Sequence, residues 1–505
     1  MWFALLLVLL PLLLLLKKDR KFVPPSPPKL PILGNLHQLG ILPHSSLRDL
    51  SSKYGPVMLL HLGRLPTVVI SSAEAARMVL KNHDLNCCTR PSLVALGRLS
   101  YNYLDISFSP YGDYWRQLRK LCVVELFSVK RVQSYRFIRE EEVVSLIHSI
   151  SPFGSSSPVN LTEKLFSFTA SIIVRMAFGK TFQQSGFNNI NDRFEEMVRE
   201  AMGVLGSFSA SEYFPYVGWI VDRLTGLHGR IERIFHKLDG LFEQVIDDHL
   251  NPGRTRPDGH EDIVEVLLRI QKDGIEFGEA PLTKNGIKAV IMVRLFLAGV
   301  DTNAATVNWA MAELARNPRV MKKTQDEVRT FAGKNGRVTE DEIDQLQYLK
   351  MVVKETLRLH PPAALLLPRE TMSYFRINGY DIHPKTLIQV NVWAICRDPR
   401  YWQNAEDFFP ERFSDSSIDF RGQHFQFLPF GGGRRSCPGM NLATRIVELA
   451  LANLLLCFDW KIPLGMKGKL VIDMEEAAGP SLTVSKKTAL HLVPVDRRSL
   501  EDHME

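Results

Sequence analysis

Apolar residues recur at every third or fourth position along most of the chain, which is the spacing of one buried helix face. The longest such stretches predict helices over residues 140–150, 231–250, 284–316, 320–332, 341–359 and 440–456. Helices of this number and length predict a mainly α fold.

Shorter runs of β-branched residues predict a smaller β region. A hairpin is expected near the start of the body, with strands at 57–62 and 67–71 and a turn at 63–65. Short strands are predicted again near 374–382, 387–392 and 490–493. No repeat and no long internal linker divides these elements, so we expect one folded body.

The first residues depart from the amphipathic pattern. Residues 1–16 carry no charge and include ten leucines, and a basic cluster follows at 17–21. Sixteen helical residues span about 24 Å, slightly less than the roughly 30 Å of a hydrocarbon core, so flanking side chains must supply the missing length. A cleaved signal peptide needs a basic region before the apolar run and a small-x-small site after it, and neither is present. The pattern predicts an uncleaved transmembrane signal anchor at 1–16.

The basic cluster after the anchor predicts the orientation of the protein. Because positive residues stay on the cytosolic side, everything from Lys17 onward is expected in the cytosol, in a single-pass protein of the endoplasmic reticulum membrane. Residues 17–40 contain the basic stop and several prolines, which predict a stiff hinge. The folded domain is then expected to occupy residues 41–505.

Composition excludes several classes of protein. The chain has 505 residues, of which 45% are hydrophobic, so a large core can form. The net charge of +7 is too dilute to indicate nucleic-acid binding. The six cysteines form no C-x-x-C pair that would hold a structural zinc, and their low density predicts a reducing compartment.

A glycine-rich loop carries the clearest chemical signal. Residues 430–439 read F-G-G-G-R-R-S-C-P-G and lead into the helical run at 440–456. A helix N-terminus and a neighbouring arginine favour the thiolate form of Cys437, while glycines let a flat ligand approach the backbone. These features predict a site for a bound metal. The alternatives are a structural turn and a phosphate cradle, which the lack of a following Gly-Lys-Ser/Thr disfavours.

This loop fits the motif F-x-x-G-x-R-x-C-x-G, and the chain resembles the cytochrome P450 family, in particular its microsomal plant members of specialised metabolism. The resemblance implies the cytochrome P450 fold, with residues 41–505 as a heme-thiolate catalytic domain behind the anchor. It implies heme b as the cofactor, with Cys437 as the axial thiolate ligand of the iron, Phe430 packed near that thiolate and Arg435 paired with a heme propionate. An anionic sulfur ligand pushes electron density onto iron and helps to cleave an O–O bond.

Further segments occur in the order that this family requires. Glu355 and Arg358 lie one helical turn apart and are followed by H-P-P at 360–362, P-R at 368–369 and P-E-R-F at 410–413. The resemblance implies that Glu355, Arg358 and Arg412 form a buried charged triad and that Arg369 reaches a propionate. A surface salt bridge is the alternative for the Glu355–Arg358 pair.

Upstream, Trp115 and Arg119 are four residues apart and share one helical face. An indole N–H and a guanidinium on this face could hold a propionate together. The alternative is a buried tryptophan beside a surface arginine.

Within the predicted helix at 284–316, the segment A-G-V-D-T at 298–302 resembles the oxygen-binding turn of the same family. The resemblance implies catalytic roles for Asp301 and Thr302, which would organise waters that deliver protons, while the helix opens at Ala298 and Gly299 to admit dioxygen. The alternative is that the Thr302 hydroxyl bonds back to the Ala298 carbonyl.

Two residues of this helix depart from the family pattern. Asn303 stands where Ser or Thr is common, and Arg294 stands where plant relatives often carry Asp or Asn. Arg294 is placed either against the substrate or against a carboxylate of a neighbouring helix.

The chain carries no dinucleotide, flavin or iron–sulfur signature, so electrons from NADPH must arrive through a partner. The resemblance implies a membrane-bound NADPH-cytochrome P450 reductase, with cytochrome b5 as a further partner. A basic patch of Lys120, Lys130, Arg131 and Arg434 is a candidate docking surface, and scattered surface charges are the alternative.

By position in the family, the substrate pocket draws on largely apolar segments at 91–113, 201–216, 294–302, 363–367 and 479–482. These segments predict a small lipophilic substrate, and a terpenoid or an aromatic plant metabolite is favoured. The predicted function is heme-dependent monooxygenation, in which one oxygen atom of O2 enters the substrate. A heme-thiolate isomerase or dehydratase acting on a peroxide or an oxime without net electron input is the alternative enzyme, and a non-catalytic heme binder is a third possibility.

Overall fold

A computed structural model describes residues 22–154, 157–181, 190–254, 260–274, 276–277, 280–332, 336–463, 472–479 and 481–496. The predicted anchor at 1–16 and the basic cluster at 17–21 lie outside these residues.

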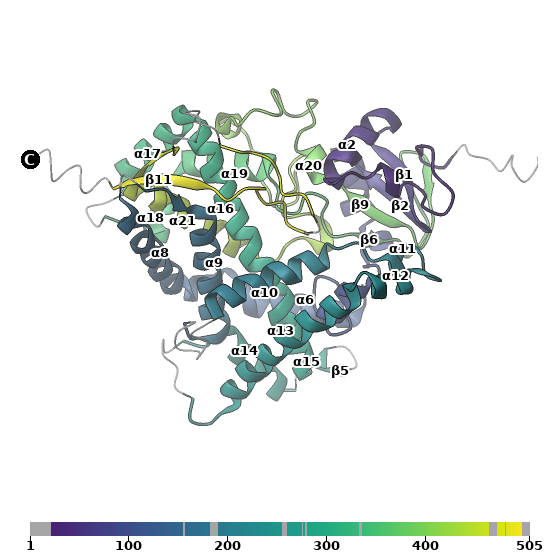
Figure 1. Ribbon diagram of the computed structural model, residues 1–505, viewed down its shortest axis with the longest axis horizontal. Coiled ribbons are helices and arrows are strands. Elements are labelled where there is room, and N and C mark those ends of the chain that lie inside the picture. The colour runs from purple at the N-terminus through teal and green to yellow at the C-terminus, as the bar shows by residue number, and fades with distance from the viewer. Residues whose placement is uncertain are drawn as a thin grey trace, which may run out of the picture.

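Helices make up most of the described chain (Figure 1). The α-helices are α2 Pro43–Tyr54, α3 Ala73–Arg77, α4 Asp84–Cys87, α5 Val94–Leu99, α6 Asp113–Leu121, α7 Val129–Ser134, α8 Arg136–Ile150, α9 Leu161–Phe178, α10 Ile190–Leu205, α11 Ala210–Tyr213, α12 Gly218–Leu224, α13 Leu227–Leu250, α14 Ile263–Lys272, α15 Lys284–Ala289, α16 Ala298–Arg316, α17 Pro318–Phe331, α18 Glu340–Ile343, α19 Gln347–Leu359, α20 Val392–Ile395 and α21 Met440–Cys457. Tighter or wider helical turns occur at Leu36–Gln38, Met78–Asn82, Cys122–Leu126, Ser151–Phe153, Val290–Leu297, Pro410–Phe413 and Gly433–Arg435.

The strands form four small sheets. The largest has the order β1-β2-β9-β6, built from β1 Val57–Leu62, β2 Leu65–Ile70, β9 Leu387–Val390 and β6 Arg369–Glu370. The second joins β10 Phe458–Lys461, β11 His491–Asp496 and β3 Val159–Asn160. Two hairpins complete the set, β4 Glu276–Phe277 with β5 Ala280–Pro281, and β7 Phe375–Ile377 with β8 Tyr380–Ile382.

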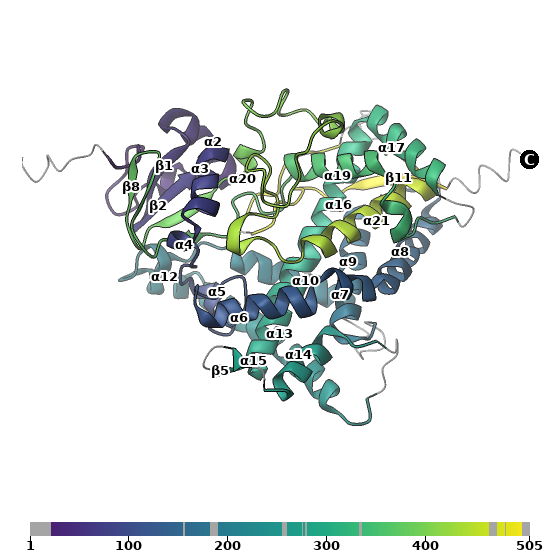
Figure 2. The same ribbon diagram turned by 180° about the vertical axis from the view of Figure 1, so that it is seen from behind.

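Helix α16 runs through the middle of the helical part and contacts α9, α19 and α21 (Figures 1 and 2). Its side chains from Val300 to Leu314 are almost all buried, because neighbouring helices cover every face. The sheet that contains β1 and β2 forms a smaller lobe at one side of the molecule, together with α2. This lobe contacts the predicted site through β6, because Arg369 of β6 donates to the Gly432 carbonyl at 3.0 Å.

The predicted elements are largely present, and their breaks are the main difference. The helix predicted over 284–316 continues through a π-helical segment at Val290–Leu297. The helix predicted over 341–359 is divided into α18 and α19. The reason is a long-range cap, because the Glu327 carboxylate of α17 accepts the amides of Tyr348 at 2.7 Å and Leu349 at 2.8 Å, which lets α19 begin there.

The proline-rich segment predicted as a hinge lies against the first sheet where the structure describes it. The Leu59 amide of β1 donates to the Pro25 carbonyl at 2.8 Å. The Asn35 side chain accepts the His61 amide at 2.8 Å and donates to the Pro28 carbonyl at 3.2 Å. These contacts fix residues 25–35 to the body.

Candidate cofactor site

A cavity of about 290 Å³ opens between α16, α6, the start of α21 and the loop at 429–439. All six predicted cofactor residues line it, namely Trp115, Arg119, Arg369, Phe430, Arg435 and Cys437, and so does Thr302, one of the two predicted catalytic residues. Segments that are far apart in the sequence therefore meet at one cavity.

The cysteine loop turns back on itself so that Cys437 comes close to Phe430. The Cys437 amide donates to the Phe430 carbonyl at 2.9 Å, and α21 begins three residues later. Gly433 has a φ of +68°, and a Cβ there would lie 2.1 Å from the Leu80 carbonyl oxygen, so only glycine fits this tight turn. Cys437 is exposed, whereas the other five cysteines of the chain are buried.

The donor set around Cys437 determines what kind of metal fits. Within the described part of the chain, no group of three or more His, Cys, Asp or Glu side chains could hold a metal ion. A single thiolate at a helix N-terminus instead suits an iron whose other ligands come from a macrocycle.

Arginines surround the same cavity. Arg435 donates to the carbonyls of Cys88 at 2.8 Å and Ser109 at 2.7 Å, and its guanidinium lies 4.2 Å from the centre of the Trp115 ring. Arg369 donates to Asp84 Oδ1 at 2.6 Å and to the Gly432 carbonyl at 3.0 Å.

Arg119 completes the predicted set and donates to the Ser436 carbonyl at 2.8 Å, beside Cys437. The indole N–H of Trp115 donates to the Ile106 carbonyl at 2.9 Å. This donor is therefore engaged with the backbone in this structure, and the Trp115 ring lies against the Arg435 guanidinium.

Arg90 is a cavity residue that the sequence patterns did not identify. Its guanidinium donates to the carbonyls of Ser107 at 2.8 Å, Leu367 at 2.8 Å and Pro368 at 2.7 Å. The predicted pocket segment began one residue later, at 91. No motif marks Arg90, because its role depends on two loops that meet only in the folded chain.

The arginines carry more positive charge than the nearby carboxylates balance. Burial lowers the pKa of Arg435 to about 9. Burial, followed by repulsion from Arg435 and Arg369, lowers the pKa of Arg90 well below its ordinary value. Two carboxylates, Asp84 and Asp105, lie near these arginines. The arginines at the cavity number four, namely Arg90, Arg119, Arg369 and Arg435. The cavity therefore fits a ligand with anionic groups, and a heme with two propionates meets this requirement.

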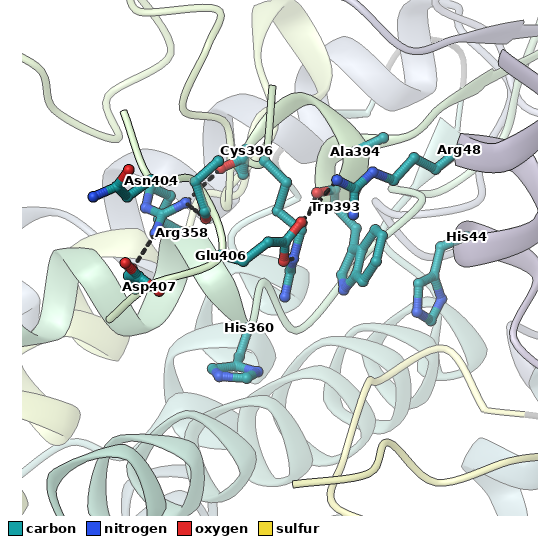
Figure 3. A network of polar contacts seen from close by, with 12 residues as sticks. His44, Arg48, Arg358, His360, Trp393, Ala394, Cys396, Asn404, Glu406 and Asp407 are labelled. Atoms are coloured by element: carbon teal, nitrogen blue, oxygen red, sulfur yellow. Dashed lines mark hydrogen bonds and ion pairs between the residues drawn. The ribbon is translucent and has the colours of Figure 1, made fainter. Parts of the chain in front are cut away.

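The predicted charged triad is present and lies outside the cavity. Arg358 donates to both oxygens of Glu355, each at 2.8 Å, and Arg412 donates to Glu355 Oε1 at 3.0 Å. Glu355 and Arg358 are fully buried. Arg358 also bonds the carbonyls of Cys396 and Asp407, as Figure 3 shows. The pair is thus a core network, and the surface salt-bridge alternative does not apply.

Helix α16 presents Thr302 to the cavity, but its hydroxyl is engaged. Thr302 Oγ1 donates to the Ala298 carbonyl at 2.6 Å, which is the bonding-back arrangement. Asn303, which stands where the family usually has Ser or Thr, bonds the next carbonyl in the same way, because its Nδ2 donates to the Gly299 carbonyl at 2.6 Å. The carbonyls at which the helix was predicted to open are both satisfied by side chains in this structure.

Asp301 lies beside the cavity and is not among the described residues that line it. Burial raises the pKa of Asp301, and a hydrogen bond from Thr483 opposes this rise. The side chain of Arg294 lies outside the described residues.

The pocket walls agree with the predicted segments. Apolar lining residues come from each of them, including Phe108, Leu205, Leu297, Leu366 and Leu482. The predicted basic patch is less uniform. Lys120 and Lys130 are exposed, whereas Arg131 pairs with Glu261 at 3.2 Å and Arg434 pairs with Asp84 at 3.1 Å.

One exposed cysteine at a helix N-terminus, facing a cavity rich in arginine within a mainly helical body, defines a heme-thiolate protein. Comparison with known proteins supports this class. The family model for cytochrome P450 matches residues 24–488, and the chain belongs to this family.

Similar proteins are known from Arabidopsis thaliana. Cytochrome P450 71B35 is 56% identical, and the match covers 95% of this chain and 94% of that protein. Cytochrome P450 71B34 is 55% identical, with 95% of this chain and 94% of that protein covered. A solved zebrafish cytochrome P450, described with abiraterone, has a TM-score of 0.74 at 24% identity and covers 91% of this chain and 100% of its own. This structure confirms the predicted fold.

Family membership establishes the reaction class. The protein is a heme-dependent monooxygenase of plant type, with a cysteine thiolate as axial ligand and with O2 and NADPH-derived electrons as cosubstrates.

Proposed function

We propose that the protein inserts one oxygen atom of O2 into a small lipophilic plant metabolite, with a terpenoid or an aromatic compound as the favoured substrate, and that Cys437 would bind the iron of its heme through the thiolate. The observation that carries this proposal is the position of Cys437, which is exposed at the cavity. The backbone of Cys437 is fixed there because its amide nitrogen lies 2.9 Å from the Phe430 carbonyl oxygen. When bound, the heme supplies the activation of dioxygen at its iron. The chain's own residues hold the cofactor, exclude water and position protons.

The arginines would bind the carboxylates of the heme. Arg435 is held by backbone carbonyls that leave its positive charge available, and Arg369 bonds the Gly432 carbonyl as well as Asp84. Arg119 lies beside Cys437 because it donates to the Ser436 carbonyl. Trp115 and Phe430 would pack on either side of this polar edge, Trp115 beneath Arg435 and Phe430 near the thiolate. Glu355, Arg358 and Arg412 would fix the core behind the cysteine loop without touching the cofactor.

Thr302 on the cavity wall and Asp301 beside the cavity would supply protons. The raised pKa of Asp301 keeps a proton available nearer to neutral pH than an ordinary aspartate would. Thr302 faces the cavity, and its hydroxyl can leave the Ala298 carbonyl for a bound water at little cost because both bonds are equivalent in kind.

A membrane-bound NADPH-cytochrome P450 reductase would deliver the electrons, with cytochrome b5 as a further partner. The exposed Lys120 and Lys130 flank exposed apolar residues at Val123, Val124 and Val129 near the cysteine loop. An apolar centre with a basic rim suits an acidic protein partner. Because Arg131 and Arg434 are paired, they contribute less charge than the sequence suggested.

The predicted anchor at 1–16 would hold the protein in the endoplasmic reticulum membrane. Exposed apolar side chains on and around α12 support a membrane-facing surface, with Tyr216 74%, Trp219 54% and Leu224 82% exposed. The turn between β1 and β2 connects this surface to Ile32, which is 81% exposed. In this turn the Gly63 amide donates to the Leu33 carbonyl and the Arg64 amide donates to the Tyr213 carbonyl, just before α12.

Substrate binding and oxygen consumption test this proposal together. A plant metabolite library is screened against the purified protein by the heme absorbance shift that accompanies displacement of iron-bound water. Compounds that bind are then incubated with NADPH and reductase. We expect NADPH-dependent O2 consumption and a product heavier by one oxygen atom. Turnover of a bound oxime or peroxide without NADPH would instead establish the isomerase or dehydratase alternative.

A further inference from the structure

The turn at residues 105–109 supplies backbone acceptors to two arginines of the cofactor cavity. Arg435 donates through Nη1 to the Ile106 carbonyl at 3.1 Å and through Nη2 to the Ser109 carbonyl at 2.7 Å. Arg90 donates through Nε to the Ser107 carbonyl at 2.8 Å. Carbonyl acceptors orient a guanidinium without neutralising it, so both arginines keep their charge for an anionic ligand.

Asp105 gives this turn its shape. Its Oδ1 accepts the Ser107 amide at 2.6 Å and the Phe108 amide at 3.2 Å, and its own carbonyl accepts the Ser109 amide at 3.2 Å. These three bonds direct the carbonyls of residues 106, 107 and 109 away from the turn and toward the arginines. The side chain of Asp105 is fully buried, so water does not substitute for these contacts.

Burial of the Asp105 carboxyl group costs free energy. Its Oδ2 has no hydrogen-bond partner among the described residues. Burial raises the pKa of Asp105 to about 6, although the two amide bonds and the charges of Arg435 and Arg90 oppose the rise. A buried polar atom without a partner lowers the stability of the fold. Folding stability alone therefore does not explain an aspartate at this position.

We propose that Asp105 is a positioning residue of the cofactor site, which shapes the 105–109 turn so that its carbonyls hold Arg90 and Arg435 toward the carboxylates of the heme. The same geometry adds Arg90 to the residues that meet these carboxylates, since it lines the cavity and its only hydrogen-bond acceptors in the described chain are backbone carbonyls. This inference rests on the heme site proposed above.

Heme retention tests the role of Asp105 without relying on catalysis. The rate of heme transfer from the purified holoprotein to excess apomyoglobin is measured for wild type, Asp105→Ala, Asp105→Glu and Asp105→Asn. Alanine removes the acceptor, and glutamate keeps the charge but displaces the carboxylate by one methylene. Both variants are expected to lose heme about tenfold faster than wild type, the effect of losing one or two hydrogen bonds. Asparagine keeps an acceptor at Oδ1, so its rate is expected to stay within about twofold of wild type.

Asp262 offers a matched control away from the cavity. It is a buried aspartate whose Oδ1 accepts the Glu265 amide at 2.9 Å and which pairs with Arg254 at 2.8 Å. Asp262→Ala is expected to lower the thermal unfolding midpoint without changing the rate of heme loss.

Three results would overturn the inference. Heme loss from Asp105→Ala or Asp105→Glu at the wild-type rate would remove the positioning role, and so would loss from Asp105→Asn as fast as from the alanine variant. A wild-type protein that binds no heme would instead refute the proposed function, so the two failures are distinguishable.

Discussion

At the scale of single residues, the site depends on charges that are buried with specific partners. Cys437 is exposed at the cavity, while Arg90, Arg369 and Arg435 are held near it mainly by backbone carbonyls and Asp84. Behind them, Arg358 and Glu355 are fully buried and fully hydrogen-bonded to each other. The cofactor site is therefore assembled by charges whose cost of burial is met only when every partner is present.

Arg358→Ala is expected to destabilise the protein by about 3–5 kcal/mol, because it leaves the buried carboxylate of Glu355 with Arg412 as its one remaining cationic partner. Chemical unfolding followed by circular dichroism measures the change. Arg319→Ala is the control, since Arg319 is exposed and pairs with Glu411, and it should cost no more than about 1 kcal/mol. Equal effects of the two substitutions would contradict the buried network.

Glu448 on α21 is predicted to make stability depend on pH. Burial raises the pKa of Glu448 to about 7, above its ordinary value near 4.5. The folded state therefore holds a proton that the unfolded state releases between these values, so this contribution to stability is complete below about pH 4.5 and is lost as the pH rises through 7.

Glu448→Gln is accordingly expected to stabilise the protein at pH 8, by roughly 2–3 kcal/mol, and to have little effect near pH 5. Thermal unfolding at the two pH values measures this, with the exposed Glu163→Gln as the control. A stabilisation of the same size at both pH values would show that the charge of Glu448 is not its cause.

At the scale of elements, periodicity predicted several of the long helices but not α9 or α10, and tertiary contacts decided where the predicted helices break. The helix expected over 341–359 is divided because Glu327, on a different helix, caps the first amides of α19. The hairpin of β1 and β2 and the strand β9 follow the predicted positions, since their signals are local. Arg90 and Asp105 were not identified, because their functions depend on the meeting of loops that are distant in sequence.

The motif residues were predicted more fully than their contacts. The cysteine loop and Arg369 line one cavity and Glu355 pairs with Arg358, and each of these residues was found because it belongs to a motif of fixed spacing. The Thr302 hydroxyl makes the bond to the Ala298 carbonyl that was one of the two predicted alternatives. The indole N–H of Trp115 donates to the Ile106 carbonyl, which its spacing to Arg119 did not predict, because side-chain orientation follows from packing.

The cap at the start of α19 is directly testable. Glu327→Ala removes the acceptor of two amides and is expected to destabilise the protein by about 1–2 kcal/mol. Asp326→Ala changes the exposed neighbouring carboxylate and should alter stability by less than about 0.5 kcal/mol. Chemical unfolding midpoints of the two variants measure the difference. A Glu327→Ala variant with the stability of wild type would contradict the capping role.

At the scale of the whole molecule, α12 lies beside the smaller lobe (Figures 1 and 2), and both carry exposed apolar side chains, among them Ile32 and Leu224. Exposed apolar surface of this extent marks an interaction site. With an anchor predicted at 1–16, this surface suits a bilayer, which would place the lipophilic substrate and the enzyme in the same phase.

A protein that lacks residues 1–21 is therefore expected to bind phosphatidylcholine vesicles through this surface. Leu224→Asp is expected to weaken this binding about tenfold or more, because a charge replaces a side chain that is 82% exposed and apolar. Vesicle co-sedimentation measures the partition, and Lys130→Asp, on the helix α7 near the cysteine loop, is the control. Unchanged binding by Leu224→Asp would exclude α12 from the membrane surface.

The bond between the Cys437 sulfur and a heme iron is the central claim, and reduction of the purified protein under carbon monoxide tests it most directly. We expect an absorbance band at the wavelength characteristic of a thiolate-ligated ferrous carbonyl in wild type, and its absence in Cys437→Ser. A wild-type protein without this band, or a serine variant that retains it, would contradict the account.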